Sequence, residues 1–211
     1  MTETAEPRPE VPDRLWERIR ADPVRAPEHI ALAAAAQHAP AAAAWAAEKR
    51  DRYAHDGHEL ARMAKRRHAT MARFEGAATG VGGIFTVIPD LVGLAWIQTH
   101  LVFFVAAAYV YDPHDPMRPA ELLVLMGIYE TPQAARAALD GMGTTMAEAY
   151  VGSRIAREEA LVTRLTKMVG KRTLRRFAGR LIPGIAMAFN AVANERDTRA
   201  LADRAIKFYG G

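Results

Sequence analysis

The sequence predicts an all-α fold in a single domain, and three observations lead to this prediction. No segment alternates apolar and polar residues with the period of two that a half-buried strand requires. Alanine, the strongest helix former, fills long stretches such as residues 31–47. Elsewhere, apolar residues recur three and four positions apart, which is the spacing of one helix face. We therefore expect eight to ten helices around one core, which a chain of 211 residues can enclose.

The composition is that of a soluble globular protein, with 50% hydrophobic and 25% charged residues. The absence of cysteine excludes disulfides, thiolate zinc sites and cysteine nucleophiles. Residues 1–12 are rich in proline and glutamate and contain no apolar run typical of a secretion signal. We expect them to form a disordered tail, followed by one helical domain over residues 13–211 in the cytoplasm.

The first part of the chain predicts a short helix near residues 12–19 and then a long helical region. Pro27 suits the first turn of a helix, and the region continues beyond Pro40 to residue 74, with Gly57 as a candidate kink. The apolar face of the short helix consists of Leu15, Trp16 and Ile19. The apolar positions late in the long region are Leu60, Met63, Met71 and Phe74, and we expect its Arg and His residues on the other faces.

The second part predicts a turn, a short buried helix and three further apolar stripes. Two Asp-Pro steps in residues 109–119 disfavour helix, and residues 120–130 form the short helix. Thr131 then suits an N-cap, with Pro132 at the first helical position. The first stripe consists of Ala135, Leu139, Met142 and Met146, and the second of Ile155, Val162, Leu165 and Val169. An apolar segment follows at 185–193. The third stripe consists of Leu201, Ala205 and Phe208, and Gly210 is the expected C-cap of its helix.

The stretch GAATGVGGIFTVIPDLVGLAWIQTHLVFF, residues 76–104, predicts a buried glycine-rich helical hairpin. Gly76, Gly80 and Gly83 recur at helical spacing, and a face without side chains allows a second backbone to approach. Asp90 can accept backbone N–H bonds where the second helix begins. A phosphate loop is excluded, because the Lys and Ser/Thr of a Walker motif are missing.

A membrane span is the alternative interpretation of this region. Twenty-one uncharged residues separate Asp90 from Asp112, which is long enough to cross a bilayer. However, Gln98, Thr99 and His100 lie at the centre of this run, where polar groups are costly. We favour a core helix, and insertion of the hairpin into a membrane stays an alternative.

Basic residues cluster in the second half, with nine Lys and Arg against two Glu over residues 154–180. Residues 162–181 are amphipathic, with apolar Leu165, Met168, Phe177 and Leu181. Such a helix can lie on an anionic membrane, or its apolar side can simply be core. The candidate residues for binding an anionic surface are Arg164, Lys167, Lys171, Arg172, Arg175 and Arg176. Nucleic acid is not expected, because interleaved aromatic residues and a helix-turn-helix pattern are both missing.

Candidates for chemistry are few. Asp90, His100 and the turn at Asp112 could line a small polar pocket, as in a metal-assisted hydrolase. Asp51, His55 and His58 fall on one face if a single helix contains them, but no established metal motif surrounds them. No nucleophile motif is present. We therefore expect no catalytic residues, metal or cofactor, and favour a non-enzymatic role.

Several motifs together resemble the EcsC family of bacterial proteins. They are the RFEGAATG segment at residues 73–80, Ile88-Pro89-Asp90, the AYVYD segment at 108–112 and the later Leu181-Ile182-Pro183-Gly184, Asn190 and Asn194. The resemblance covers roughly residues 25–209. The family tends toward Tyr-Gly-Tyr where this chain has Tyr109-Val110-Tyr111. The family's name comes from an operon that encodes an ABC transporter, and it implies no catalytic residues.

The expected function is therefore that of an accessory protein at the inner face of the membrane. The resemblance implies a transporter-linked role, and the basic helix indicates an anionic lipid or a membrane protein as the partner. Two alternatives stay open: an enzyme with a small pocket, and an interaction module that binds a soluble protein through an exposed apolar patch.

Overall fold

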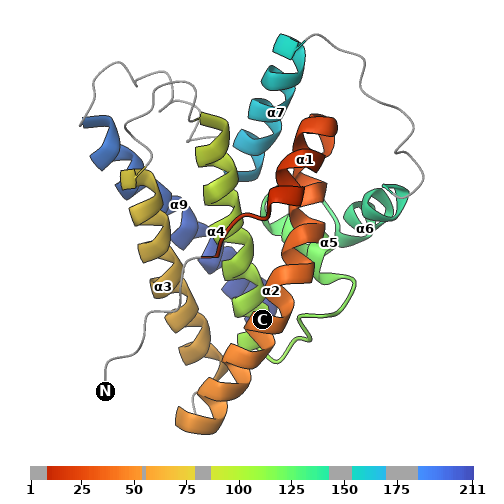
Figure 1. Ribbon diagram of the computed structural model, residues 1–211. Coiled ribbons are helices and arrows are strands. Elements are labelled where there is room, and N and C mark those ends of the chain that lie inside the picture. Colours follow the sequence, from red (N-terminus) through yellow and green to blue (C-terminus); the bar gives the residue numbers. More distant parts are fainter. Residues whose placement is uncertain (1–8, 54–55, 79–86, 143–153, 170–184) are drawn as a thin grey trace.

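The structure is a computed structural model that describes residues 9–53, 56–78, 87–142, 154–169 and 185–211. Over these residues it is all-α, with eight α-helices, one 3-10 helix and no strand, which confirms the predicted fold class. The elements are α1 (Asp13–Ala21), η1 (Pro23–Arg25), α2 (Ala26–Tyr53), α3 (Gly57–Ala78), α4 (Val87–Ala108), α5 (Arg118–Leu125), α6 (Pro132–Gly141), α7 (Arg154–Val169) and α9 (Ile185–Gly210) (Figure 1).

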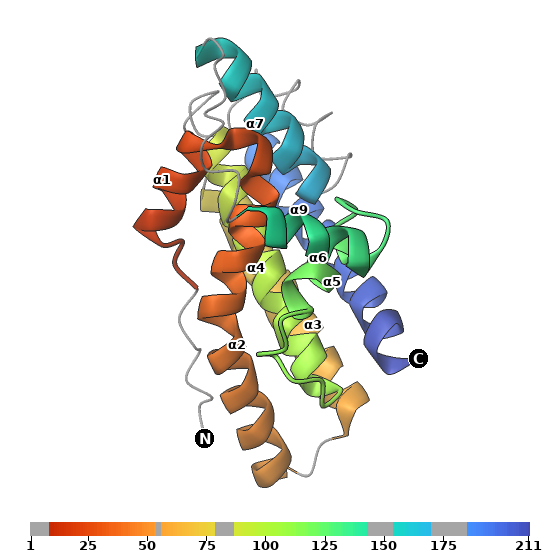
Figure 2. The ribbon, with the colours of Figure 1, turned by 90° about the vertical axis from the view of Figure 1, so that its right-hand side faces the viewer.

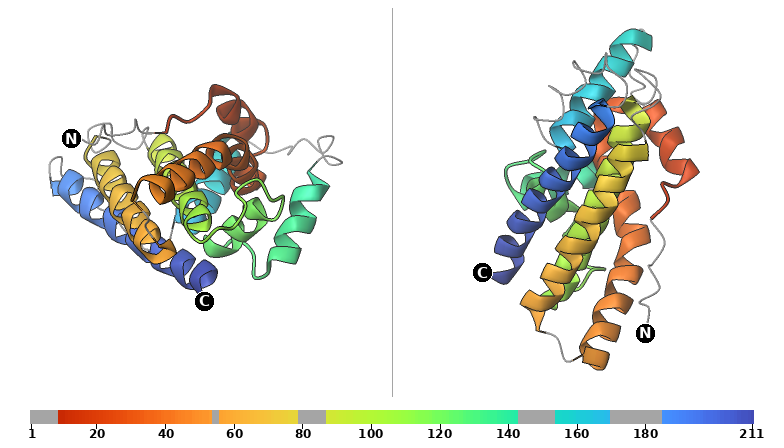
Figure 3. Two further views of the ribbon diagram at one scale, coloured as in Figure 1. Left: turned by 90° about the horizontal axis from the view of Figure 1, so that it is seen from below. Right: turned by 90° about the vertical axis from the view of Figure 1, so that its left-hand side faces the viewer.

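Helix α4 is the central element of the bundle. Every residue from Asp90 to Ala108 is buried, including the large side chains of Trp96, Phe103 and Phe104. Helices α2, α3, α7 and α9 pack around it, and the view along the bundle shows α4 enclosed by its neighbours (Figure 3, left). A helix that is apolar on all sides has to be covered on all sides, so the predicted core helix is confirmed.

Helices α3 and α9 run antiparallel along one side of α4 (Figures 1 and 3). Lys65 of α3 pairs with Asp203 of α9 at 2.5 Å, and Arg73 pairs with Glu195 at 3.8 Å. The bundle therefore has two distinct ends. We call the end where α3 stops and α4 and α9 begin the upper end, and the end where α4 and α9 stop and α3 begins the lower end.

The remaining helices cover one side and the upper part of the bundle. Helices α5 and α6 lie together on the side that faces the viewer in Figure 2, where α5 packs on α2, α4 and α9. Helix α7 lies at the upper part and packs on α4, α2 and η1. Thr131 caps α6 as predicted, because its hydroxyl accepts a hydrogen bond from the Ala134 amide at 3.2 Å.

The long helical region continues through Pro40 as predicted, but it divides before Gly57, where only a kink was expected. Helix α2 continues through Pro40, whose exposed position lets the helix tolerate the lost hydrogen bond. The chain instead reverses between Tyr53 and Gly57, so the kink predicted at Gly57 is the start of a new helix. The Asp56 carboxylate caps this helix by accepting from the Glu59 amide at 2.7 Å, and the Asp-x-x-Glu pattern is a start signal that the prediction missed.

The buried face of α3 also differs from the predicted stripe. Leu60 is buried as expected, but Phe74 is 68% exposed and Met63 and Met71 are only partly buried. The side chains that face the core recur every four residues and include Leu60, Ala64, His68 and Ala72. Small residues on this face allow α3 to approach α4 and α9 closely, which is why alanine rather than methionine or phenylalanine occupies it.

The predicted glycine-rich hairpin is described in part. Gly76 lies in the last turn of α3, and α4 begins at Val87, so Asp90 follows the helix start instead of preceding it. Helices α3 and α4 do pack together, with His68 of α3 against His100 of α4. Gly80 and Gly83 lie outside the described residues, so the close approach expected at the glycines stays a prediction.

The C-terminal segment forms one helix where two were expected. Helix α9 contains both the apolar segment at 185–193 and the predicted last helix. Leu201, Ala205 and Tyr209 form its buried stripe, whereas Phe208, which was assigned to that stripe, is 42% exposed. Gly210 is the last helical residue, and Gly211 is the glycine in the left-handed region, with φ of 88°.

Candidate functional site

The predicted pocket residues lie along one helix and do not surround a common cavity. Asp90 lies near the start of α4, His100 in its middle and Asp112 in the turn beyond its end. With a rise of 1.5 Å per residue, Asp90 and Ala108 are about 27 Å apart. The groove of about 360 Å³ between α1 and α2 contains none of them, since it is lined by residues such as Arg14, Arg18 and Gln37.

His100 belongs to a cluster of three buried histidines, one from each of three helices. His38 of α2 and His68 of α3 are 1% and 0% exposed, and His100 of α4 is 5% exposed. The His68 Nε2 and His100 Nδ1 atoms are 2.6 Å apart. The His38 ring lies edge-on to the His100 ring with centroids 4.6 Å apart, and against Trp96 at 4.3 Å. The cluster thus joins α2, α3 and α4 in the core.

The hydrogen bonds assign tautomers within the cluster. His68 Nδ1 lies 2.7 Å from the Ala64 carbonyl oxygen and must donate to it. Its Nε2 is then an acceptor, so the His100 Nδ1–H donates to it. Two buried polar atoms beside these hydrogen-bonded histidines, His38 Nε2 and Trp96 Nε1, have no hydrogen-bond partner within the described part of the protein.

The electrostatics keep all three imidazoles neutral. Burial, with a contribution from His68, lowers the pKa of His38 to about 3. Burial also lowers the pKa of His68 to about 3 and lowers the pKa of His100 further, because His68, His38 and Arg67 lie beside it. Neutral histidines are potential metal ligands. However, no group of three or more His, Cys, Asp or Glu among the described residues can hold a metal ion.

The other candidate metal site, Asp51, His55 and His58, required one continuous helix, and the structure has two helices there. Asp51 lies in α2 and His58 in α3, while His55 lies outside the described residues. The prediction that Asp51 and His58 share one helix face is therefore wrong. His58 Nδ1 lies 2.8 Å from the Tyr109 hydroxyl, which joins the start of α3 to the end of α4.

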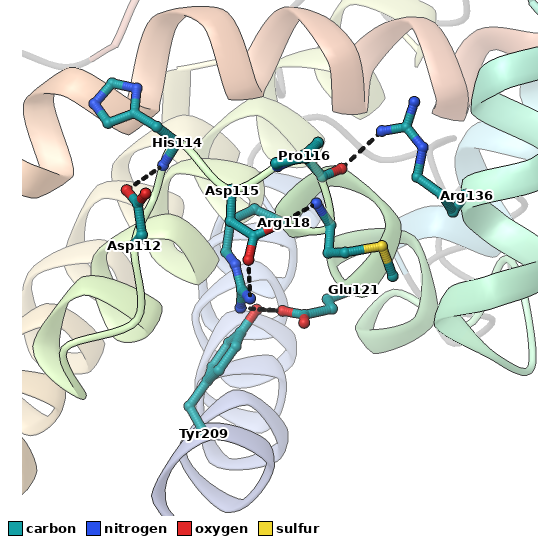
Figure 4. A network of polar contacts seen from close by, with 9 residues as sticks. Asp112, His114, Asp115, Pro116, Arg118, Glu121, Arg136 and Tyr209 are labelled. Atoms are coloured by element: carbon teal, nitrogen blue, oxygen red, sulfur yellow. Dashed lines mark hydrogen bonds and ion pairs between the residues drawn. The ribbon is translucent and has the colours of Figure 1, made fainter.

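The turn at Asp112 uses its carboxylates to shape the backbone. Asp112 accepts from the His114 amide at 2.9 Å, and Asp115 accepts from the Met117 amide at 2.8 Å (Figure 4). Such Asx turns are ordinary loop chemistry. The Arg136 guanidinium donates to the Pro116 carbonyl at 2.8 Å and so ties the turn to α6. The Asp112 and Asp115 carboxylates and the Pro116 carbonyl therefore have structural roles in the turn.

Arg118 is the centre of a second polar network (Figure 4). It is buried, pairs with Glu121 and Asp115, and lies against the rings of Tyr111 and Tyr209 at 5.2 and 5.5 Å. The Tyr209 hydroxyl donates to Glu121 at 2.8 Å. Burial raises the pKa of Glu121, and burial together with Glu121 raises the pKa of Tyr209. A neutral Tyr209 therefore remains a donor, and the network fastens α9 to α5 at the lower end.

The end of α4 contains an exposed residue in an unusual conformation. Val110 has a φ of 67° and is 78% exposed. Its amide donates to the Ala107 carbonyl at 3.1 Å, and the Tyr111 amide donates to Ala106 at 3.1 Å, which is the Schellman pattern of a helix C-terminus. Arg50 of α2 donates to the carbonyls of Ala107 and Ala108 at 2.5 and 2.8 Å. Glycine is the usual residue in place of Val110.

The basic candidates divide between α7 and a segment outside the described residues. Lys167 is exposed and donates to the Ile128 carbonyl at 3.4 Å, and Arg164 is half-buried near Tyr129. Lys171, Arg172, Arg175 and Arg176 lie outside the described residues. The apolar side of α7 consists of Leu161, Leu165, Met168 and Val169, all of which are buried. Leu165 and Met168 are therefore core residues and not membrane contacts, as one of the two interpretations predicted.

The upper end has exposed apolar and basic side chains that the prediction did not single out. Phe74 of α3 is 68% exposed and Val192 of α9 is 59% exposed. Arg73, next to Phe74 in sequence, and Arg196, one helical turn after Val192, are also exposed. The sequence did contain a sign that Phe74 is exposed. The buried face of α3 repeats every four residues at Leu60, Ala64, His68 and Ala72, and Phe74 lies on a different face. By contrast, the pairing of His68 with His100 had no sequence signal, because it depends on how α3 and α4 pack.

Fold and site together define an all-α bundle whose described polar clusters join one helix to another. The model of the EcsC protein family matches residues 31–210. The chain therefore belongs to the EcsC protein family, as the motif resemblance indicated. No curated protein and no solved structure matches the chain.

Proposed function

We propose that this protein is a non-enzymatic accessory protein that associates peripherally with the anionic inner face of the cytoplasmic membrane, where it contacts lipid or a membrane protein. Supporting this is the burial of α4, the described helix that is long and apolar enough to cross a bilayer. The segment Ile88–Ala108 has a mean hydropathy of 1.8, and every residue from Asp90 to Ala108 is buried within the protein. Burial of this helix in the core supports a peripheral contact with the membrane over a span formed by α4.

The observation that carries the proposal is the orientation of α7. Its apolar side packs in the core, so Lys167 lies on the exposed side of α7, where its ammonium donates to the Ile128 carbonyl. The next basic residues in the sequence are Lys171, Arg172, Arg175 and Arg176. Residues 170–184 contain five Lys and Arg and no acid. Basic side chains near an anionic surface contribute up to ~1 kcal/mol each. The attraction is therefore electrostatic in origin, and we expect salt to weaken it.

Cosedimentation with vesicles tests the proposal. We expect the protein to bind phosphatidylglycerol-containing vesicles at low salt, and to bind much less at high salt or to pure phosphatidylcholine. Replacing Lys171, Arg172, Arg175 and Arg176 by Gln should weaken binding on the order of a hundredfold or more. The matched control replaces four exposed cations elsewhere, namely Arg14, Arg20, Arg62 and Lys207, by Gln.

The two variants remove the same net charge from different places. If both weaken binding equally, the membrane responds to net charge and not to this segment. If the wild-type protein does not bind anionic vesicles at all, the proposal is wrong.

A second candidate function, a protein-interaction module, is supported by the exposed apolar side chains at the lower end. Val110, Tyr111 and Phe208 are 78%, 42% and 42% exposed, and the Tyr209 ring lies 5.0 Å from that of Tyr111 and 4.9 Å from that of Phe208. Self-association is the form of this function that purified protein can test. Sedimentation velocity should then show a dimer that Phe208→Ser converts to monomer, whereas a wild-type monomer would contradict it.

A further inference from the structure

The apolar residues at the upper end are the starting point for the inference. Five large apolar side chains are exposed among the described residues, and Phe74 and Val192 are the two that lie at this end. Phe74 follows Arg73 in α3, and Arg73 pairs with Glu195 of α9 at 3.8 Å. Val192 lies one helical turn before Glu195 on the same face of α9. The two apolar residues therefore lie on neighbouring helices at about the same height.

The register of the two helices supports this placement. Lys65 and Arg73 are eight residues apart on α3, and their partners Asp203 and Glu195 are eight residues apart on α9. The register of the two helices is therefore constant between the two ion pairs. Continued by one residue, this register places Phe74 opposite Asn194, and Val192 about 3 Å nearer the upper end. Helix α4 also begins at this end, at Val87, as Figure 1 shows.

The charge around these residues favours an anionic partner. Arg73 and Arg196 are exposed, and Arg199 is bound to Glu195 at 2.9 Å. The acids in these parts of α3 and α9 are Glu75, which follows Phe74 in the chain, Glu195, which pairs with both Arg73 and Arg199, and Asp197, which interacts with Arg204 farther toward the lower end. Three cations and three acids therefore balance within these parts of α3 and α9, and the positive excess comes from residues 170–184, which precede α9 in the sequence and contain five cations and no acid.

We propose that Phe74 and Val192 enter the interface of an anionic bilayer while Arg73 and Arg196 contact its headgroups. This deepens the proposed function and rests on it. Aromatic and aliphatic side chains flanked by Arg are the residues that bury apolar area at the boundary between headgroups and acyl chains. The bundle then stands on the membrane by its upper end, with α3 and α9 directed away from the surface.

The absence of cysteine gives a direct test. Phe74→Cys and Val192→Cys are each labelled with one environment-sensitive fluorophore, and Phe208→Cys at the lower end is the matched control, because it too replaces an exposed apolar residue. With phosphatidylglycerol-containing vesicles, we expect a blue shift and higher intensity at positions 74 and 192 and no change at 208. Circular dichroism checks that each labelled protein is folded.

A binding measurement complements the fluorescence. Phe74→Ser combined with Val192→Ser should weaken partition onto anionic vesicles about tenfold, the loss expected from removing roughly half the burial of two apolar side chains. Val110→Ser combined with Phe208→Ser should bind like the wild-type protein. Wild-type binding with no fluorescence change at 74 and 192 would overturn the inference and leave the proposed function standing. A wild-type protein that does not bind removes both.

Discussion

Val110 is a single residue whose backbone conformation lowers the stability of the folded protein. It occupies the left-handed backbone region, where a side chain branched at Cβ is strained by about 1–2 kcal/mol. Its side chain is mostly in water, so packing within the chain does not offset that cost. The hydrogen bonds from Val110 and Tyr111 to Ala107 and Ala106 hold the strained conformation, because they complete the end of α4.

We predict that Val110→Gly stabilises the protein by about 1 kcal/mol. Relief of left-handed strain outweighs the added freedom that glycine gives the unfolded chain, which costs about 0.5–1 kcal/mol. Urea unfolding monitored by circular dichroism measures the change. Val192→Gly, at an exposed site within α9, is the control and should lose a few tenths of a kcal/mol, about 0.4. A loss of stability in Val110→Gly would show that the valine makes a favourable contact.

Histidines 38, 68 and 100 make the free energy of unfolding depend on pH. Burial lowers their pKa values below 6.5, so the unfolded chain binds more protons than the folded one as pH falls. The stability that their neutral forms support is complete above pH 6.5 and is lost as the pH falls below 6.5, down to about 3 for His38 and His68 and to lower pH for His100. Within that pH range, each histidine lowers the free energy of unfolding by about 1.4 kcal/mol for every unit by which the pH falls.

We predict that the urea midpoint falls steeply between pH 6.5 and 5, before most carboxylates titrate. His38→Leu should flatten that slope, because one proton-binding group is removed from the unfolded chain. The exposed His114→Gln should leave the slope unchanged. The measurement is a series of urea titrations at half-unit steps of pH, and equal slopes for wild type and His38→Leu would contradict the assignment.

At the scale of elements, the lower end depends on glycines that allow helix ends to meet. A Cβ at Gly57 would lie 3.0 Å from the Ala108 carbonyl oxygen, and one at Gly210 would lie 2.8 Å from the Tyr109 ring. The ends of α9 and α4 and the start of α3 thus converge on Tyr109. Tyr109 also binds His58, so the contact holds all three helices.

We predict that Gly210→Ala destabilises the protein by about 1–3 kcal/mol, because the new methyl group overlaps the Tyr109 ring. Gly141→Ala in α6 is the matched control, since nothing lies within 4 Å of its Cβ position. It should gain up to about 1 kcal/mol from helix propensity. Thermal unfolding of the two variants should therefore shift in opposite directions, and a stabilised Gly210→Ala would argue against the close contact.

At the scale of the whole molecule, the two ends of the bundle differ in the side chains that they carry. The lower end contains the Arg118 network and the capped end of α4, where charges are paired and helices are fastened together. The upper end exposes Phe74 and Val192 beside unburied arginines. This difference is why vesicle binding is proposed for the upper end, and why Phe208 and Val110 provide its controls.

Much of the fold followed from local patterns in the sequence. The alanine-rich region, the apolar run of α4 and the Thr131 cap each contained their own signal, and the structure confirms them. The predictions that differed involved the orientation of a face, as at Phe74 and Phe208, or the boundary of a helix, as at Gly57. Those outcomes depend on which neighbour a helix packs against, and a single stretch of sequence does not contain that information.

The sequence by itself determined the helical class, the family and the distribution of charge, because propensity, motif and composition are local properties. Only the tertiary structure decided that Asp90, His100 and Asp112 lie far apart, that three histidines from three helices meet, and that the exposed Phe74 and Val192 lie at about the same height on neighbouring helices. The physical reason is that these relations depend on the register and direction of packed helices. Register is set by the fit of whole faces, in which small residues such as Ala64 and Ala72 of α3 matter as much as the polar ones.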